Sequence, residues 1–155
     1  MNLVDELHAI TGALRETGVE YAVCGGIAVT ICGATRSTKD IDLLVPAAEV
    51  PRILELVRRL GYLFAALPMT FEAGTPKERH VQRVSKVDGS DHLILDLLAA
   101  DASLAGFLEG RREIALPEWP LVVDSLDALR KMKRLAGRPQ DLADLAALEG
   151  ASDAP

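Results

Sequence analysis

Residues 24–45, CGGIAVTICGATRSTKDIDLLV, place two glycines before a short apolar run and two aspartates at the start of another. Side chains of a strand alternate between its faces, so Asp40 and Asp42 are predicted to point the same way, while Ile41 points into the core. At the mouth of a pocket, carboxylates about 7 Å apart repel by roughly 2–3 kcal/mol at an effective dielectric of about 20. A bound Mg²⁺ relieves this repulsion, since it prefers one or two carboxylates together with phosphates and waters. The alternative is a solvated pair in which one aspartate caps a turn.

The glycine pair is predicted to join a strand over 19–24 to a short helix over 27–32. Glycine allows a phosphate to approach the backbone, which a side chain would obstruct. Gly25 and Gly26 are therefore candidate phosphate-binding residues, although an ordinary tight turn would also use them. The stretch is neither a P-loop nor a dinucleotide-binding motif.

A third carboxylate stands in the apolar run Leu93–Leu98. Asp88-Gly-Ser-Asp91 before it is a strong hairpin signal, so the runs 81–87 and 92–98 are predicted to pair. An unpaired charge in such a strand is costly. If this strand lies beside Asp40 and Asp42, Asp96 could help to bind a second metal ion or accept a proton from an attacking hydroxyl. Alternatively, Asp96 faces solvent on the polar side of the hairpin.

Helical and strand periodicities predict one α/β (α+β) domain built on a small mixed β-sheet flanked by helices. The domain is expected to span residues 1–149, with residues 150–155 as a disordered tail. Apart from the segments above, the expected elements are helices over about 2–17, 50–60 and 103–109, a strand near 113–116, and a C-terminal helical pair over about 125–136 and 139–148.

The first helix of that pair carries a basic cluster in an acidic chain. Its apolar positions are expected to be buried and to push the cations outward: Leu126, Leu129, Met132 and Leu135. Lys131 or Lys133 is then predicted to reach a triphosphate, because an ammonium suits phosphate as a point charge. The alternatives are a solvated basic face, or pairing with Asp141 and Asp144.

Charge and apolar composition exclude some classes of protein. The formal net charge of −6 argues against indiscriminate binding to nucleic acid or to anionic membranes. No apolar run approaches the roughly 18 residues of a membrane helix. The first residues lack a signal-peptide pattern, so a cytoplasmic protein is expected.

The ordered set of Gly25-Gly26, Arg36-Ser-Thr38, Asp40-Ile-Asp42 and Asp96 resembles the nucleotidyltransferase fold shared with DNA polymerase β. The Thr-x-Asp-Ile-Asp signature and the C-terminal run RPQDLADL, residues 138–145, are similar to the minimal, AbiEii-like branch. Ile27 departs from the pattern, because many relatives carry serine directly after the glycine pair.

This resemblance implies an enzyme that transfers a nucleoside monophosphate from a nucleoside triphosphate to a hydroxyl of RNA or a small molecule, with Mg²⁺ or Mn²⁺. Asp40, Asp42 and Asp96 would then be the catalytic and metal-binding residues. The nucleotide-binding residues would be Gly25, Gly26, Arg36, Thr38, Lys131 and Lys133. The branch includes toxins, so a toxin with an antitoxin partner is one expectation; a non-catalytic module that acts through a partner protein is the alternative.

Overall fold

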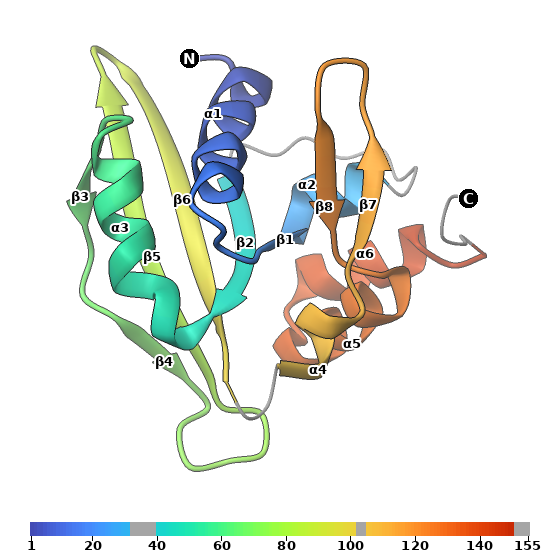
Figure 1. The fold of residues 1–155 in the computed structure, drawn as a ribbon. Helices are drawn as coiled ribbons and strands as arrows, with labels where there is room; N and C mark the ends of the chain where they lie inside the picture. The colour runs from blue at the N-terminus through green and yellow to red at the C-terminus, as the bar shows by residue number, and fades with distance from the viewer. Residues whose placement is uncertain (32–39, 102–104, 151–155) are drawn as a thin grey trace.

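The computed structural model describes residues 1–31, 40–101 and 105–150. A mixed β-sheet forms the centre of the fold (Figure 1). Its order is β3-β5-β6-β2-β1-β8-β7, and β4 pairs with β5. β2 with β6 and β1 with β8 are parallel pairs, whereas the other pairs are antiparallel. The strands are β1 Ala22–Cys24, β2 Asp40–Pro46, β3 Tyr62–Ala65, β4 Met69–Phe71, β5 Arg79–Asp88, β6 Asp91–Ala100, β7 Arg112–Ala115 and β8 Pro120–Val123.

Helices pack around the sheet: α1 and α3 contact each other, and the C-terminal pair α5 and α6 also contact each other, at the lower right of the view in Figure 1. The first helix begins where the Asn2 side chain accepts hydrogen bonds from the backbone N–H groups of Val4 and Asp5. The helices are α1 Leu3–Glu16, α2 Gly25–Ile31, the 3₁₀ helix η1 Ala47–Glu49, α3 Val50–Arg58, α4 Ala105–Glu109, α5 Leu126–Ala136 and α6 Pro139–Ala147.

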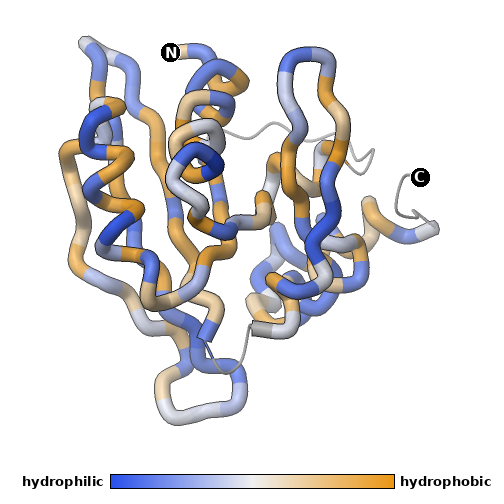
Figure 2. The backbone as a smooth tube through the Cα atoms, viewed as in Figure 1, coloured by the Kyte–Doolittle hydropathy of each residue, from blue (hydrophilic) through white to orange (hydrophobic). Residues whose placement is uncertain are grey.

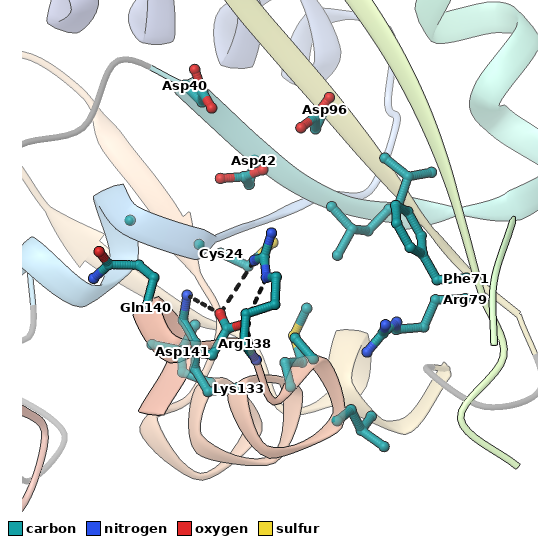
Figure 3. A pocket seen from close by; sticks show the side chains of 18 of the residues that line it. Cys24, Asp40, Asp42, Phe71, Arg79, Asp96, Lys133, Arg138, Gln140 and Asp141 are labelled. Atoms are coloured by element: carbon teal, nitrogen blue, oxygen red, sulfur yellow. Dashed lines mark hydrogen bonds and ion pairs between the residues drawn. The ribbon is translucent and has the colours of Figure 1, made fainter. Parts of the chain in front are cut away.

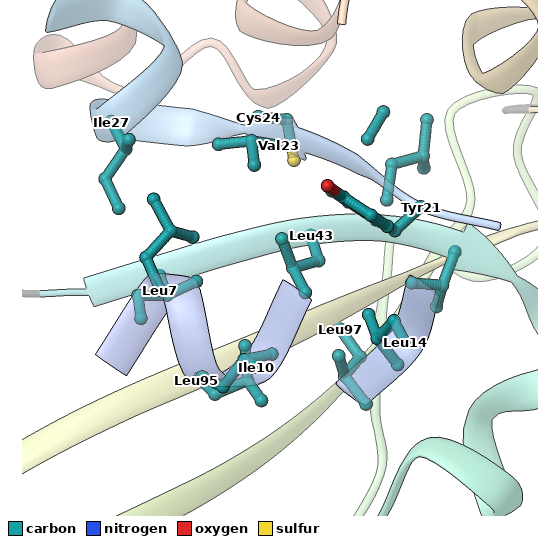
Figure 4. Close-up of a cluster of buried hydrophobic side chains, with 14 of the residues drawn as sticks. Leu7, Ile10, Leu14, Tyr21, Val23, Cys24, Ile27, Leu43, Leu95 and Leu97 are labelled. Atoms are coloured by element: carbon teal, nitrogen blue, oxygen red, sulfur yellow. The ribbon is translucent and has the colours of Figure 1, made fainter. Parts of the chain in front are cut away.

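The main core lies between α1 and the central strands. Leu7, Ile10 and Leu14 recur at helical spacing on α1 and are all buried. Figure 4 shows them packed toward the side chains of β2 and β6, among them Leu43 and Leu95. Hydrophobic residues accordingly follow these strands along the backbone (Figure 2).

Strand alternation gives β2 and β6 a second, polar face. Leu43 and Leu97 are register partners and belong to the core. Asp42 and Asp96, one position earlier on each strand, therefore face the opposite side. The predicted direction of the aspartate pair is confirmed, and it places these carboxylates on the side of α5 and α6.

Several predicted boundaries differ from the structure. The helix expected from residue 27 begins at Gly25. The strand β8, which pairs in parallel with β1, was not predicted at all. Most of the expected tail, 151–155, lies outside the described residues. Within the described ranges, no helix is long and apolar enough to cross a membrane.

Candidate active site

Gly25 and Asp42 approach each other so closely that only glycine fits. β1 pairs antiparallel with β2, and Cys24 is the register partner of Asp42. Gly25 has φ +65°, in the region that favours glycine. A Cβ on Gly25 would lie 2.1 Å from Oδ2 of Asp42. Glycine at this position therefore makes room for the Asp42 carboxylate and leaves its own backbone accessible.

The three predicted aspartates line one cavity of about 640 Å³ (Figure 3). Asp42 and Asp96 are direct register partners on the parallel strands β2 and β6, and Asp40 lies two residues before Asp42 on the same face. Gly25 and Gly26 line the same cavity. The glycine pair and the three aspartates therefore lie together in the structure, as the sequence predicted.

Asp96 has a partner that sequence reasoning missed. Arg83 on β5 donates from Nε to Oδ1 at 2.8 Å and from Nη2 to Oδ2 at 3.0 Å. This bidentate pair raises the pKa of Arg83, and the nearby charges of Asp40 and Asp42 contribute. Asp96 is buried at 8% exposure, so the alternative that it faces solvent is wrong. Both carboxylate oxygens of Asp96 accept hydrogen bonds from the Arg83 guanidinium, whereas the sequence predicted that Asp96 binds a metal ion.

The hairpin itself contained the signal for this pair. The turn pairs Asp88 with Asp91. Counting outward from that pair, five residues back reach Arg83 and five residues forward reach Asp96, which are register partners. The same count joins Val81 to Leu98. Extending the predicted turn into a register would therefore have found the partner of Asp96.

Lys133, which was predicted to reach a triphosphate, is instead buried and paired with carboxylates in the structure. Lys133 is buried at 7% exposure, because it shares the inner face of α5 with Leu129, four residues earlier. Its Nζ lies 3.3 Å from Asp141 and 2.9 Å from Asp144. The expectation that the core stripe pushes every cation of this helix outward is wrong for Lys133, whereas pairing with the two aspartates is confirmed.

Asp141 also binds Arg138, which lies at the start of α6. The Arg138 Nε donates to Asp141 at 2.7 Å, and its side chain is 74% exposed. Burial would raise the pKa of Asp141, but its bonds to Arg138 and the charge of Lys133 lower it below the ordinary value. Lys133 and Arg138 line the cavity, so α5 and α6 bring two cations to its wall.

Lys131 lies elsewhere. It is exposed, pairs with Asp127 one turn earlier on α5 at 2.9 Å, and is not among the residues that line the cavity. The structure therefore does not bring it together with the aspartates. Arg36 and Thr38, the other predicted nucleotide-binding residues, fall outside the described residues.

Oxygen donors dominate the part of the cavity where a metal ion is predicted. Asp40 and Asp42 supply carboxylates, which are ligands that Mg²⁺ prefers. Across residues 1–31, 40–101 and 105–150, no group of three or more potential ligand side chains could hold a metal ion. Two carboxylates completed by phosphate and water fit this donor set better than a closed site of three protein ligands.

Two further titratable groups are buried in this region, Cys24, which lines the cavity, and Asp124. Cys24 is a free cysteine, and burial raises the pKa of its thiol, with Asp42 and Asp124 adding to the effect. The Asp124 carboxyl is completely buried; its Oδ1 accepts from the backbone N–H of Ser125, while its Oδ2 has no hydrogen-bond partner. Burial raises the pKa of Asp124 to about 7, although Ser125 and Arg111 act in the opposite direction.

A mixed sheet that presents an aspartate pair beside a glycine turn, with a further aspartate on the parallel neighbour, defines the nucleotidyltransferase fold. Among the solved structures similar to the chain are two antibiotic adenylyltransferases. The lincomycin-bound lincosamide antibiotic adenylyltransferase LnuA shares 14% identity with a TM-score of 0.61, over 94% of this chain and 96% of that one. ANT(2")-Ia in complex with adenylyl-2"-tobramycin shares 20% identity with a TM-score of 0.64, over 94% and 87%.

The chain belongs to the aminoglycoside-2''-adenylyltransferase family, whose sequence model matches residues 6–90. No curated protein sequence matches it. The nucleotidyltransferase superfamily predicted from sequence is confirmed, but the AbiEii-like branch is replaced by this family. Family membership also identifies the protein as a nucleotidyltransferase.

Proposed function

We propose that this protein transfers a nucleoside monophosphate from a nucleoside triphosphate to a hydroxyl group of a small molecule, with Mg²⁺ or Mn²⁺. The observation that carries the proposal is the meeting of Gly25, Asp42 and Asp96 in one cavity. The family supports the transfer reaction. The solved relatives, one with lincomycin and one with adenylyl-2"-tobramycin, support a small-molecule acceptor.

Asp40 and Asp42 would hold the metal ion. They lie on one face of β2 and supply oxygen donors. When bound, the ion would neutralise charge on the phosphates and orient them. Gly25 leaves the space that the Asp42 carboxylate occupies, because any larger residue there would collide with it.

The triphosphate is proposed to lie beside the Gly25-Gly26 backbone. Arg36 and Thr38 keep the nucleotide-binding role inferred from sequence. Arg138 is better placed to bind phosphate than Lys131, because it lines the cavity, is largely exposed and lies close enough to Asp42 for that charge to help raise its pKa. The pairing of Arg138 with Asp141 is the larger cause of that shift and orients the guanidinium.

Asp96 is proposed to accept the proton of the attacking hydroxyl. The hydroxyl oxygen forms a bond to the α-phosphorus, the bond from that phosphorus to the bridging oxygen breaks, and pyrophosphate leaves with the electron pair. Arg83 acts as a positioning residue, since its two hydrogen bonds fix the orientation of the Asp96 carboxylate beside Asp42.

A label-transfer assay tests this proposal. The purified chain is incubated with Mg²⁺ and each α-labelled nucleoside triphosphate, with lincomycin, tobramycin, hydroxylated metabolites or transfer RNA as acceptor. Label is expected on a small molecule, and Asp42→Ala should abolish the transfer while keeping the wild-type melting temperature within a few degrees. Labelled RNA alone would instead favour the RNA acceptor and the toxin role, which remain predictions from the sequence. A folded protein inactive with every pair would refute the proposed function.

A further inference from the structure

The cavity has a second end, which is apolar. Along the face that carries Asp96, the next position on β6 is Leu98. Leu98 is the register partner of Val81 on β5, and Val81 is the partner of Met69 on β4. Across from this row, α5 contributes Met132 and other apolar side chains that remain only partly buried. This wall continues the floor of the site beyond the reacting carboxylates.

Arg79 ends this wall. It lies two residues before Val81 on the same face of β5, and it is the register partner of Phe71. Its guanidinium carbon stands over the Phe71 ring, 5.7 Å from the centroid. Figure 3 shows the Arg79 side chain directed into the cavity, on the opposite side from α2. About 13 Å of strand, four residues at ~3.3 Å each, separates Arg79 from Arg83.

The Arg79 Nη1 atom is buried without a hydrogen-bond partner. A guanidinium has five N–H donors and no acceptor, so an oxyanion is the group that satisfies a buried one best. The other cavity cations already have carboxylates: Arg83 binds Asp96, while Lys133 and Arg138 bind Asp141. Among the described residues that line the apolar end, none pairs with the positive charge of Arg79.

An aminoglycoside fits this end poorly. Such a molecule carries several protonated amines at neutral pH, and it needs carboxylates or carbonyl oxygens around them. Apart from Arg79, the described residues lining this end are Met69, Phe71, Val81, Leu98, Met132 and Leu135. A guanidinium among apolar side chains repels a polycation and offers no hydrogen-bond acceptor to its amines.

We propose that the acceptor of this protein is an anionic hydroxyl compound with an apolar body, not a polycation. This inference rests on the proposed function. The acceptor hydroxyl lies at Asp96, the apolar body crosses Leu98 and Val81, and its carboxylate or phosphate binds Arg79. The reaction itself is unchanged: the hydroxyl oxygen bonds the α-phosphorus, its proton passes to Asp96, and pyrophosphate leaves.

Binding of matched probes tests the charge preference without requiring turnover. Calorimetry with a non-hydrolysable nucleoside triphosphate present compares ω-hydroxydecanoate, ω-hydroxydecyl phosphate, the methyl ester of the first, ω-aminodecanol and tobramycin. The wild type is expected to bind at least one anionic probe about tenfold or more tightly than the ester or either amine. Arg79→Met should remove that preference and leave ester binding unchanged. Arg59→Met, which removes an exposed charge outside the cavity, is the matched control and should keep it.

Three results overturn the inference: no measurable binding of either anionic probe, equal or tighter binding of an amine, or an unchanged preference in Arg79→Met. Release of pyrophosphate with the same probes is measured separately. An anion preference at Arg79 without transfer to any acceptor would leave the subsite standing and refute the proposed function. Transfer to tobramycin by a protein that ignores both anionic probes would do the reverse.

Discussion

Replacing Gly25 by alanine is predicted to displace the Asp42 carboxylate. The new Cβ would stand 2.1 Å from Oδ2 and 2.6 Å from Cγ of Asp42. To reach an ordinary carbon–oxygen contact of ~3.3 Å, the two groups must separate by about 1 Å. A misplacement of this size in an active site costs on the order of 100-fold in rate. Gly25→Ala should therefore lose most of its activity while the remainder of the fold stays intact.

Gly18 provides a matched control for the backbone strain. Its φ is +71°, close to the +65° of Gly25, but no atom lies within 4 Å of the position its Cβ would take. Alanine in this conformation costs roughly 1–2 kcal/mol at either position. Both variants should therefore lower the melting temperature, by about 2–4 °C for each kcal/mol. Only Gly25→Ala also changes the site.

Calorimetric titration of Mn²⁺ and a non-hydrolysable nucleoside triphosphate reads out the site independently of the acceptor. We expect Gly25→Ala to weaken this binding at least about tenfold, as for other changes that disorient metal ligands. Gly18→Ala should bind within about twofold of the wild type. Wild-type affinity in a folded Gly25→Ala protein would contradict this prediction, since it would mean that the site does not depend on the position of Asp42.

Two further predictions concern buried charges. Lys133→Met should lower the free energy of unfolding by ~3–5 kcal/mol, because it removes the buried cation that lies between Asp141 and Asp144, whereas Lys131→Met should leave the melting temperature unchanged in the same thermal scan. Asp124→Asn should flatten the pH dependence of stability. The folded pKa of about 7 exceeds the ordinary value near 4, so the stabilising contribution of this carboxyl is complete below about pH 4 and is lost as the pH rises through 7. The melting temperature should therefore fall more in the wild type than in Asp124→Asn between pH 5 and 8; parallel curves would contradict the assignment.

Local patterns predicted the parts of the fold that depend on neighbours in sequence. The apolar spacing of α1 and of α3, the turn at Gly89 and the alternation around Ile41 are all short-range features, and the structure has the corresponding elements. The strand β8 was not predicted because its four residues give too short a pattern, and because its pairing depends on β1, which is distant in sequence.

Charge pairing was harder to predict, for two physical reasons. The Arg83–Asp96 pair needs a register, which depends on a turn and the strands it aligns rather than on composition. The burial of Lys133 depends on which face of α5 meets the sheet side and on α6 packing beside it. In the sequence alone, a lysine flanked by other cations indicates a solvated helix face. Only the packing of α6 shows that its carboxylates surround Lys133.

The family match covers only part of the cavity wall. The matched region, residues 6–90, contains Gly25 and Asp42, which form the nucleotide end of the proposed site. It also contains Arg79 and Val81 of the apolar end, but it stops before β6 and the C-terminal helices, which supply Asp96, Leu98 and Met132. The solved structures, at 14% and 20% identity, share the fold alone, so they do not define the acceptor of this chain. The acceptor has to be inferred from this chain's own wall, where an arginine stands among apolar side chains.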